Sequence, residues 1–425
     1  MKLMRYRYYL MIVGVLLFGS THAQTATDTN EHVAQNRKNA PAQAKKPYVI
    51  LISADGFRHD YAEKYNASYL LQFGKQGVQA ESMIPSYPSV TFPNHYSIVT
   101  GMYPSHHGIV NNGFYDERTK ERYSMGAKQK VRDGKWYGGT PIWVLAEQQN
   151  LLSANMFWVG SEAEIKGTRP SYYYDYTERI TADERIEIVK NWLTLPEETR
   201  PHLITFYVSE PDHAGHRYGP DAPQTEKAVK MVDSIVYKLS EAVKPLGLPV
   251  NFIFVSDHGM TAVDRENPIP TPKAIDTAKY IIASSGTMMV IHAKNKADVL
   301  PLYEQLKSNE NGFKAYLKSN MPKHLHYSTT DDRMNRIGDI LLLPEWPRVF
   351  SNRKPGIGHH GFDPSFVKDM HTSFIAWGPE FKKSLKIPAF ENVHVYPLIA
   401  HILGLKYNEK IDGKPKVLQS ILKSK

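Results

Sequence analysis

The chain has 425 residues, 41% of them apolar, which is enough material for one large globular domain with insertions or for two smaller domains. Its formal charge of +9 at pH 7 is spread along the sequence, which is compatible with anionic substrates but does not indicate a nucleic-acid groove. The sequence contains no cysteine, and this excludes disulfides, thiol catalysis and thiolate metal sites.

Residues 1–23 have the layout of a secretory signal peptide. The basic stretch MKLMRYRYY precedes the apolar run LMIVGVLLFG, and small residues follow up to Ala23. Because the apolar run is shorter than the ~20 residues that cross a bilayer, we predict cleavage after Ala23 and a periplasmic or secreted bacterial protein without a membrane span. An uncleaved N-terminal anchor is the alternative.

The remaining chain divides into a polar segment and a long folded region. Residues 24–46 have few aromatic or β-branched residues and no periodicity, so we predict a disordered linker there. The folded domain is expected over 47–425. It contains four continuous apolar runs, each typical of a strand buried on both faces of a parallel sheet: PYVILISADG, HLITFYVSEP, PVNFIFVSDHG and HTSFIAWGPEF.

Helical patterns alternate with these runs, at 61–76, 141–149, 182–193 and 224–246. The alternation predicts an α/β fold with a central, mostly parallel sheet flanked by helices. Residues 262–350 break the pattern and indicate a small α+β insertion. Within it we expect strands at 287–293, 324–328 and 339–343, and helices at 296–307 and 312–319.

Three aspartates, Asp55, Asp212 and Asp257, each lie just past the end of an apolar run. Sites in α/β sheets form beyond the carboxyl ends of the strands, so we expect these carboxylates to meet. Histidines accompany them in the sequence. His216 follows Asp212 by four residues, either on one helix face or around a turn, and His258 follows Asp257 directly.

A glycine-flanked loop adds His359 and His360 to this set. Asp and His ligands without Cys suit Zn²⁺, although Mn²⁺ or Fe also binds such residues. Each pair alone is compatible with ordinary hydrogen-bonded loop residues. Together they are enough ligands for two metal ions ~3.5–4 Å apart.

Thr91 lies in the stretch SVTFPNHYSIVTG, among residues that punctuate the chain. A threonine hydroxyl attacks only when a base or a metal activates it, and a two-metal site can hold it as an alkoxide. The helical pattern at 94–100 places Thr91 at a helix N-terminus, where free N–H groups favour an alkoxide and a phosphoryl group. The alternative role is that of a helix N-cap.

The motifs SVTFPNHYSIVTGMYPSHHGIVNNGFYD, EPDHAGHRYGP, VSDHGM and HHGFDP resemble those of the nucleotide pyrophosphatase/phosphodiesterases of the alkaline phosphatase superfamily. The resemblance extends from Tyr48 to about Leu405, in the family's motif order. It implies an alkaline-phosphatase-like fold, two Zn²⁺ per chain, and hydrolysis of nucleotide phosphodiester or pyrophosphate bonds. The resemblance also implies a covalent phosphothreonine intermediate and release of a nucleoside 5′-monophosphate.

The resemblance also assigns roles to individual residues. Thr91 matches the nucleophile and Asn112 the donor of a hydrogen bond to a phosphoryl oxygen, whereas His359 has no matching role. Phe92 and Tyr176 match the two aromatic side chains that sandwich the base, with core packing as the alternative for Phe92. One ion would be bound by Asp212, His216 and His360, and the other by Asp55, Thr91, Asp257 and His258.

Other functions fit parts of the pattern. Relatives in the same family cleave choline-phosphate or lysophospholipid head groups, and other members of the superfamily are phosphomonoesterases. An exported binding or structural protein that kept the fold and lost the chemistry is a further alternative, but no expected ligand is missing. The sequence predicts a small-molecule substrate and says nothing of oligomeric state.

Overall fold

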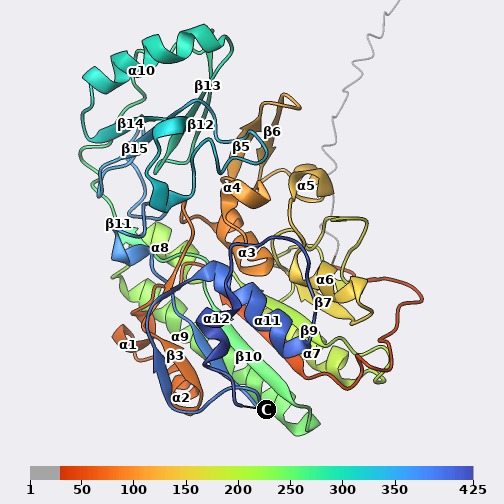
Figure 1. Ribbon diagram of the computed structural model, residues 1–425. Coiled ribbons are helices and arrows are strands. Elements are labelled where there is room, and N and C mark those ends of the chain that lie inside the picture. Colours follow the sequence, from red (N-terminus) through yellow and green to blue (C-terminus); the bar gives the residue numbers. More distant parts are fainter. Residues whose placement is uncertain (1–28, 425) are drawn as a thin grey trace, which may run out of the picture.

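The structure, a computed structural model, describes residues 29–424, so the predicted signal peptide lies outside the described residues. A nine-stranded mixed sheet runs through the main body (Figure 1). Its strands in spatial order are β1 (His32–Val33), β8 (Tyr172–Tyr173), β7 (Ser153–Met156), β9 (Leu203–Val208), β2 (Tyr48–Ala54), β10 (Val250–Val255), β17 (Ile375–Trp377), β3 (Val78–Ala80) and β18 (Leu385–Ile387).

Strands β7, β9, β2 and β10 are parallel neighbours, and all seven residues of β2 are buried. Alternate side chains of β2 enter different cores, because successive residues of a strand point to opposite faces. Val49 and Leu51 pack into one core, and Ile50 and Ile52 into the other. Burial on both faces is the reason that the apolar runs show no alternation.

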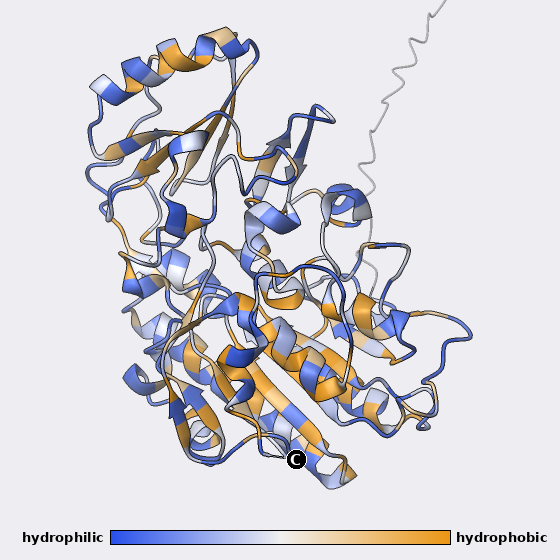
Figure 2. Cartoon of the chain, viewed as in Figure 1, coloured by the Kyte–Doolittle hydropathy of each residue, from blue (hydrophilic) through white to orange (hydrophobic). Residues whose placement is uncertain are grey.

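Helices cover both faces of the sheet, and their apolar sides meet the apolar strands (Figure 2). One layer contains α3 (Thr91–Thr100), α6 (Ile142–Gln148) and α11 (Val395–Leu403). The other contains α2 (Ser68–Gln76), α7 (Ala182–Thr194) and α9 (Pro223–Val243). Shorter elements are α1 (Tyr61–Lys64), α4 (Pro104–His107), α12 (Pro415–Gln419), β4 (Met83–Ile84), β11 (Thr261–Ala262) and β19 (Phe390–Glu391).

The helices expected at 141–149, 182–193 and 224–246 are present within a few residues. The helix expected at 61–76 is instead two helices, α1 and α2, because Asn66 between them has a left-handed backbone with φ 51°. Within residues 29–424, no helix is long and apolar enough to span a membrane.

The fourth apolar run differs from the parallel strand that we expected. Strand β17 pairs antiparallel with β10, with Phe252 opposite Trp377. The chain is still at the carboxyl edge of the parallel strands at Met370, shortly before β17, because the N–H of Gly259, beyond the end of β10, donates to the carbonyl of Met370 at 2.9 Å. A parallel arrangement would need a crossover of a dozen or more residues back to the other edge.

The predicted disordered linker is wrong for residues 29–46. Strand β1 pairs antiparallel with β8 at the edge of the sheet. Asn39 is buried, donates from Nδ2 to the carbonyls of Glu197 and Arg200, and accepts from the N–H of Leu152. Polar contacts therefore hold this segment at the edge of the sheet. A prediction from its low content of aromatic and β-branched residues could not detect such contacts.

The expected insertion is a separate four-stranded antiparallel sheet that projects from the main body (Figure 1). Its strands in order are β12 (Tyr280–Ser284), β13 (Met289–Ala293), β15 (Ile340–Pro344) and β14 (Phe313–Leu317). Helix α10 (Val299–Ser308) packs on this sheet around a small core of its own.

Two expectations within the insertion are wrong. The helix expected at 312–319 is strand β14, in which Phe313 and Ala315 are buried and Lys314 is exposed, the alternation of a half-buried strand. The strand expected at 324–328 is a 3-10 turn at Lys323–Leu325, and it ends at His326 with φ 49°.

Arg336 fastens the insertion to the main body. Its side chain is 2% exposed, and Nε donates to Asp116 Oδ2 at 2.8 Å. Its Nη1 donates to the carbonyls of Gly108 and Trp136, at 2.7 Å each. A buried guanidinium with this many acceptors is costly to remove because its carboxylate partner stays behind.

We expect Arg336→Met to destabilise the fold by about 3–5 kcal/mol, because Asp116 would remain as a buried, poorly compensated charge. Urea unfolding measures this effect. Arg118→Met is the matched control, since Arg118 is 53% exposed and lies 3.4 Å from the same carboxylate. Equal midpoints for the two variants would contradict the assignment.

Candidate active site

The three aspartates come together at the carboxyl edge of β2, β9 and β10. The N–H of Asp212 donates to the carbonyl of Asp55 at 3.0 Å, so the loops after β9 and β2 touch. Gly56 permits this approach. It has φ 70°, and a Cβ at this position would lie 2.9 Å from the Cα of Asp212. The side chains also approach one another: the ligand atoms of Asp55 lie within 4.8 Å of those of Asp212 in one group and of those of Asp257 in another.

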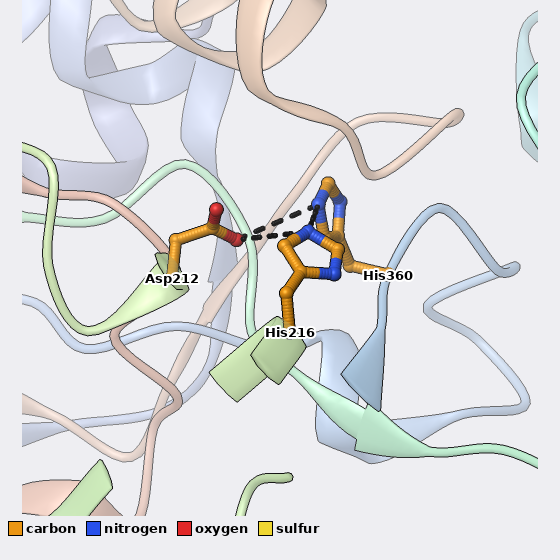
Figure 3. A group of neighbouring side chains, drawn as sticks. All are labelled: Asp212, His216 and His360. Atoms are coloured by element: carbon orange, nitrogen blue, oxygen red, sulfur yellow. Dashed lines mark hydrogen bonds and ion pairs between the residues drawn. The ribbon is translucent and has the colours of Figure 1, made fainter. Parts of the chain in front are cut away.

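One group of side chains consists of Asp212, His216 and His360 (Figure 3). Helix α8 (Asp212–Tyr218) places Asp212 and His216 on one face, with His216 Nε2 3.4 Å from Asp212 Oδ1. His360 follows β16 (Gly358–His359), and its Nε2 lies 3.0 Å from His216 Nε2 and 3.6 Å from Asp212 Oδ1. The helix, not the turn, brings the first two together.

A second group gathers around His258. Its Nε2 lies 3.3 Å from Asp55 Oδ1 and 3.0 Å from Asp257 Oδ2. Strand β10 ends at Val255, so Asp257 and His258 are beyond the strand alternation and both face this centre. Asp212 belongs to both groups. Its carboxylate also lies close to Asp55 and His258, and the ligand atoms of these three residues are within 4.8 Å of one another.

Backbone carbonyls orient all three imidazoles. The Nδ1 atoms of His216, His258 and His360 lie 2.8, 2.9 and 3.1 Å from the carbonyls of Gly358, Gly259 and Ser89. A carbonyl only accepts, so we infer that each Nδ1 carries the proton and each Nε2 presents a lone pair to the centre. Metal-binding histidines in proteins are oriented in this way.

The carboxylates also have the arrangement of ligands. Asp55 Oδ1, Asp212 Oδ1 and Asp257 Oδ2 are buried and have no hydrogen-bond donor among residues 29–424. Burial raises the pKa of Asp55, and the Asp257 and Asp212 carboxylates raise it further. Burial also lowers the pKa of His360 well below its usual range, and His258 and His216 add to this. These residues fit a metal centre, because cations compensate such oxygens and lone pairs.

Thr91 points its hydroxyl at the second group. Its Oγ1 lies 3.1 Å from His258 Nε2. Helix α3 begins at Thr91 itself, its N-cap is Val90, and no side chain caps the helix. The structure therefore rejects the N-cap alternative and places the hydroxyl next to His258, at the N-terminus of α3.

Asn112 lies beside Thr91. Its Oδ1 accepts a hydrogen bond from the N–H of Phe92 at 2.8 Å, immediately after Thr91 in the chain. The side-chain NH₂ group is then the part of Asn112 that can donate to a substrate oxygen.

A pocket of about 440 Å³ opens next to Thr91, Asp55 and Asp212. Phe92 lines it and also packs partly buried against the main core, so both of its expected environments are present. Tyr176 lines it from another segment and is 42% exposed. The other lining residues are Met125, Gly126, Lys128, Val131, Phe157, Trp158, Val159, Glu162, Tyr207 and His213.

His359 belongs to neither group of ligands. Its ring packs edge-on against His216, with the centroids 5.7 Å apart, and burial lowers its pKa to about 4, with His216 lowering it further. It lies beside the centre as a packing neighbour of a ligand.

Sequence reasoning missed two residues that contact the ligands. His95 Nδ1 lies 3.0 Å from the carbonyl of Thr91 and 3.4 Å from Asp257 Oδ2. Its position four residues after Thr91, on the same helix face, is a signal that could have identified it. Tyr207 donates from its hydroxyl to Asp55 Oδ2 at 2.7 Å, but within an apolar strand it looks like a core residue.

The chain matches, over residues 49–363, the family described as type I phosphodiesterase / nucleotide pyrophosphatase. The chain belongs to this family. Ectonucleotide pyrophosphatase/phosphodiesterase family member 1 of Homo sapiens is 37% identical over 385 residues, which are 87% of this chain and 41% of the relative. This chain therefore spans less than half the length of that relative.

A second human relative, bis(5′-adenosyl)-triphosphatase ENPP4, is 35% identical over 85% of this chain and 79% of its own length. Among solved structures, murine ectonucleotide pyrophosphatase/phosphodiesterase 5 has a TM-score of 0.82 and 28% identity, over 88% of this chain and 100% of that one. An inactive threonine-to-alanine variant of that protein, in complex with AMP, matches equally well. The predicted α/β, alkaline-phosphatase-like fold is thus confirmed, and the family and the ligand groups are compatible with metal binding.

We expect Asp257→Ala to lower both the metal content and the melting temperature of the protein, because this carboxylate faces the candidate metal centre and metal binding is coupled to folding. Elemental analysis and thermal unfolding measure the two effects. Asp183→Ala, which removes an exposed carboxylate on α7, is the control. Unchanged zinc content in the Asp257 variant would contradict its role as a ligand.

Proposed function

We propose that the protein is a zinc-dependent hydrolase that cleaves phosphodiester or pyrophosphate bonds of nucleotides and releases a nucleoside 5′-monophosphate. The observation that carries this proposal is the convergence of the aspartate and histidine ligand atoms with Thr91 Oγ1, 3.1 Å from His258 Nε2. Family membership supports it, as do the names of the relatives.

Two Zn²⁺ ions per chain suit this set of ligands. Asp212, His216 and His360 would hold one ion, and Asp55, Asp257, His258 and Thr91 the other. Mixed carboxylate and imidazole ligands without thiolates are common in catalytic zinc sites. When bound, the ions supply positive charge that stabilises a threonine alkoxide and the phosphoryl oxygens.

Thr91 is the proposed nucleophile. Its Oγ1 attacks phosphorus in line, the new Oγ1–P bond forms as the bond to the leaving oxygen breaks, and a phosphothreonine diester results. Water then hydrolyses this diester, which frees the threonine hydroxyl and the nucleoside monophosphate. The NH₂ group of Asn112 donates to a non-bridging oxygen as charge develops there. The inactive threonine-to-alanine variant of the murine relative is consistent with this role.

The pocket beside Thr91 suits a nucleobase. Phe92 and Tyr176 both line it, and two aromatic faces bind any base because every base has a stacking surface. The AMP complex of the murine relative supports a nucleotide as the ligand. We propose that Phe92 and Tyr176 hold the base while Thr91 reacts.

The location and extent of the active unit are also proposals. We propose that the chain is exported after cleavage at Ala23, to the periplasm or the medium, and that residues 47–425 form the catalytic domain. The family match over residues 49–363 lies within these limits and runs through the insertion.

We expect Thr91→Ala to lower kcat by at least about 10³-fold, because a covalent route without its nucleophile is closed. Zinc content should stay near that of the wild type. Thr91→Ser keeps a hydroxyl and is the matched control, which should retain measurable turnover. Activity in Thr91→Ala equal to that of the wild type would exclude this nucleophile.

Substrate class is tested by comparing the p-nitrophenyl ester of thymidine 5′-monophosphate with p-nitrophenyl phosphate and p-nitrophenyl phosphorylcholine. We expect kcat/KM for the nucleotide diester to exceed the other two by at least about tenfold, because only its base can stack in the aromatic pocket. Preference for the monoester would indicate a phosphomonoesterase, and preference for the choline ester would indicate a head-group phosphodiesterase.

A further inference from the structure

Three of the segments that line the proposed base pocket lie outside the central parallel strands, whereas Phe92 on α3 and Tyr207 on β9 line it from the main body. The first is α5 (Lys128–Val131) with the turn before it, the second is the stretch 157–162, and the third carries Tyr176. None of these is part of the central parallel strands, so the shape of the pocket depends on contacts between the segments.

Arg132 joins all three segments. It directly follows α5. Its Nε donates to Glu162 Oε2 at 2.8 Å, and its Nη2 donates to Asp175 Oδ2 at 2.5 Å. Glu162 uses its other oxygen, Oε1, to accept the N–H of Tyr176 at 2.8 Å. Arg132 itself does not line the pocket.

The guanidinium of Arg132 neutralises two carboxylates that are more buried than it is. The side chains of Glu162 and Asp175 are 12% and 8% exposed, whereas Arg132 is 38% exposed. His32 also approaches Asp175, at 3.5 Å. Removal of the guanidinium would leave two largely buried carboxylates without the cation that they share, and we expect this to loosen the contact between Glu162 and the backbone of Tyr176.

We propose that Arg132 is a positioning residue that sets the width of the nucleotide-binding pocket by clamping α5 to the segments that carry Glu162 and Tyr176. This inference rests on the proposed nucleotide function. The clamp acts on the base and leaves the reacting phosphoryl group to Thr91 and the metal ligands. It therefore influences binding of nucleotides more than the chemical step.

The experiment compares wild type, Arg132→Met and Arg132→Lys on two diesters. One is the p-nitrophenyl ester of thymidine 5′-monophosphate, and the other is methyl p-nitrophenyl phosphate, whose retained methyl group has no aromatic ring to stack in the pocket. Arg132→Met keeps a long apolar stem but removes the charge and both donors. Lys230→Met, which removes an exposed ion pair on α9, is the control for loss of a surface cation.

We expect Arg132→Met to raise KM for the nucleotide diester about tenfold, comparable to the loss of part of one base-stacking contact, with kcat nearly unchanged. Its kcat/KM for methyl p-nitrophenyl phosphate should equal that of the wild type, which also shows that the variant is folded. Arg132→Lys should recover part of the affinity, because a point charge neutralises the carboxylates without the two-pronged geometry.

Two results would overturn the clamp. One is an unchanged nucleotide KM in Arg132→Met, and the other is an equal loss on both diesters, which would indicate a general structural role. A wild-type protein that does not prefer the nucleotide diester would overturn the proposed nucleotide function, and the clamp with it. Wild-type preference combined with an unchanged variant would overturn the clamp alone.

Discussion

The structure depends on the mutual approach of buried carboxylate oxygens and imidazole lone pairs at one edge of the sheet. Asp55, Asp212 and Asp257 each present an oxygen that has no donor among residues 29–424, and three histidine Nε2 atoms face them. Such a cluster is unfavourable unless cations share it. Backbone carbonyls accept from the Nδ1 atoms of these histidines, so each ring is held with its Nε2 lone pair directed at the carboxylates. The proposed hydrolysis follows from this requirement, because the same cations that neutralise the carboxylates would also activate the hydroxyl of Thr91.

Three parallel strands and one helix bring these side chains together. Parallel strands β2, β9 and β10 end at the same edge, and the N-terminus of α3 brings Thr91 to it. The insertion also reaches the centre, because the Thr287 hydroxyl donates to the carbonyl of His360 at 3.1 Å. The insertion therefore helps to hold His360, one of the candidate metal ligands, in place.

Much of this could be predicted from the sequence, where local pattern and chemistry coincide. Aspartates after buried strands predicted the centre, and the apolar runs predicted the parallel strands. Contacts that depend on distant partners could not be predicted: the polar anchoring of Asn39, the reversed direction of β17 and the pairing of β14. Tyr207 and Arg132 could not be identified from the sequence, because nothing near them in the chain shows which carboxylate each one contacts, whereas the spacing of His95 from Thr91 was a usable signal.

The account is tested most directly by anomalous X-ray diffraction at the zinc edge on crystals of the zinc-loaded protein. We predict two peaks about 3.5–4 Å apart. One should lie in bonding distance of Asp212, His216 and His360, and the other of Asp55, Asp257 and His258, with Thr91 Oγ1 facing it. No peak at this edge of the sheet, or zinc bound only elsewhere on the molecule, would contradict the central claim.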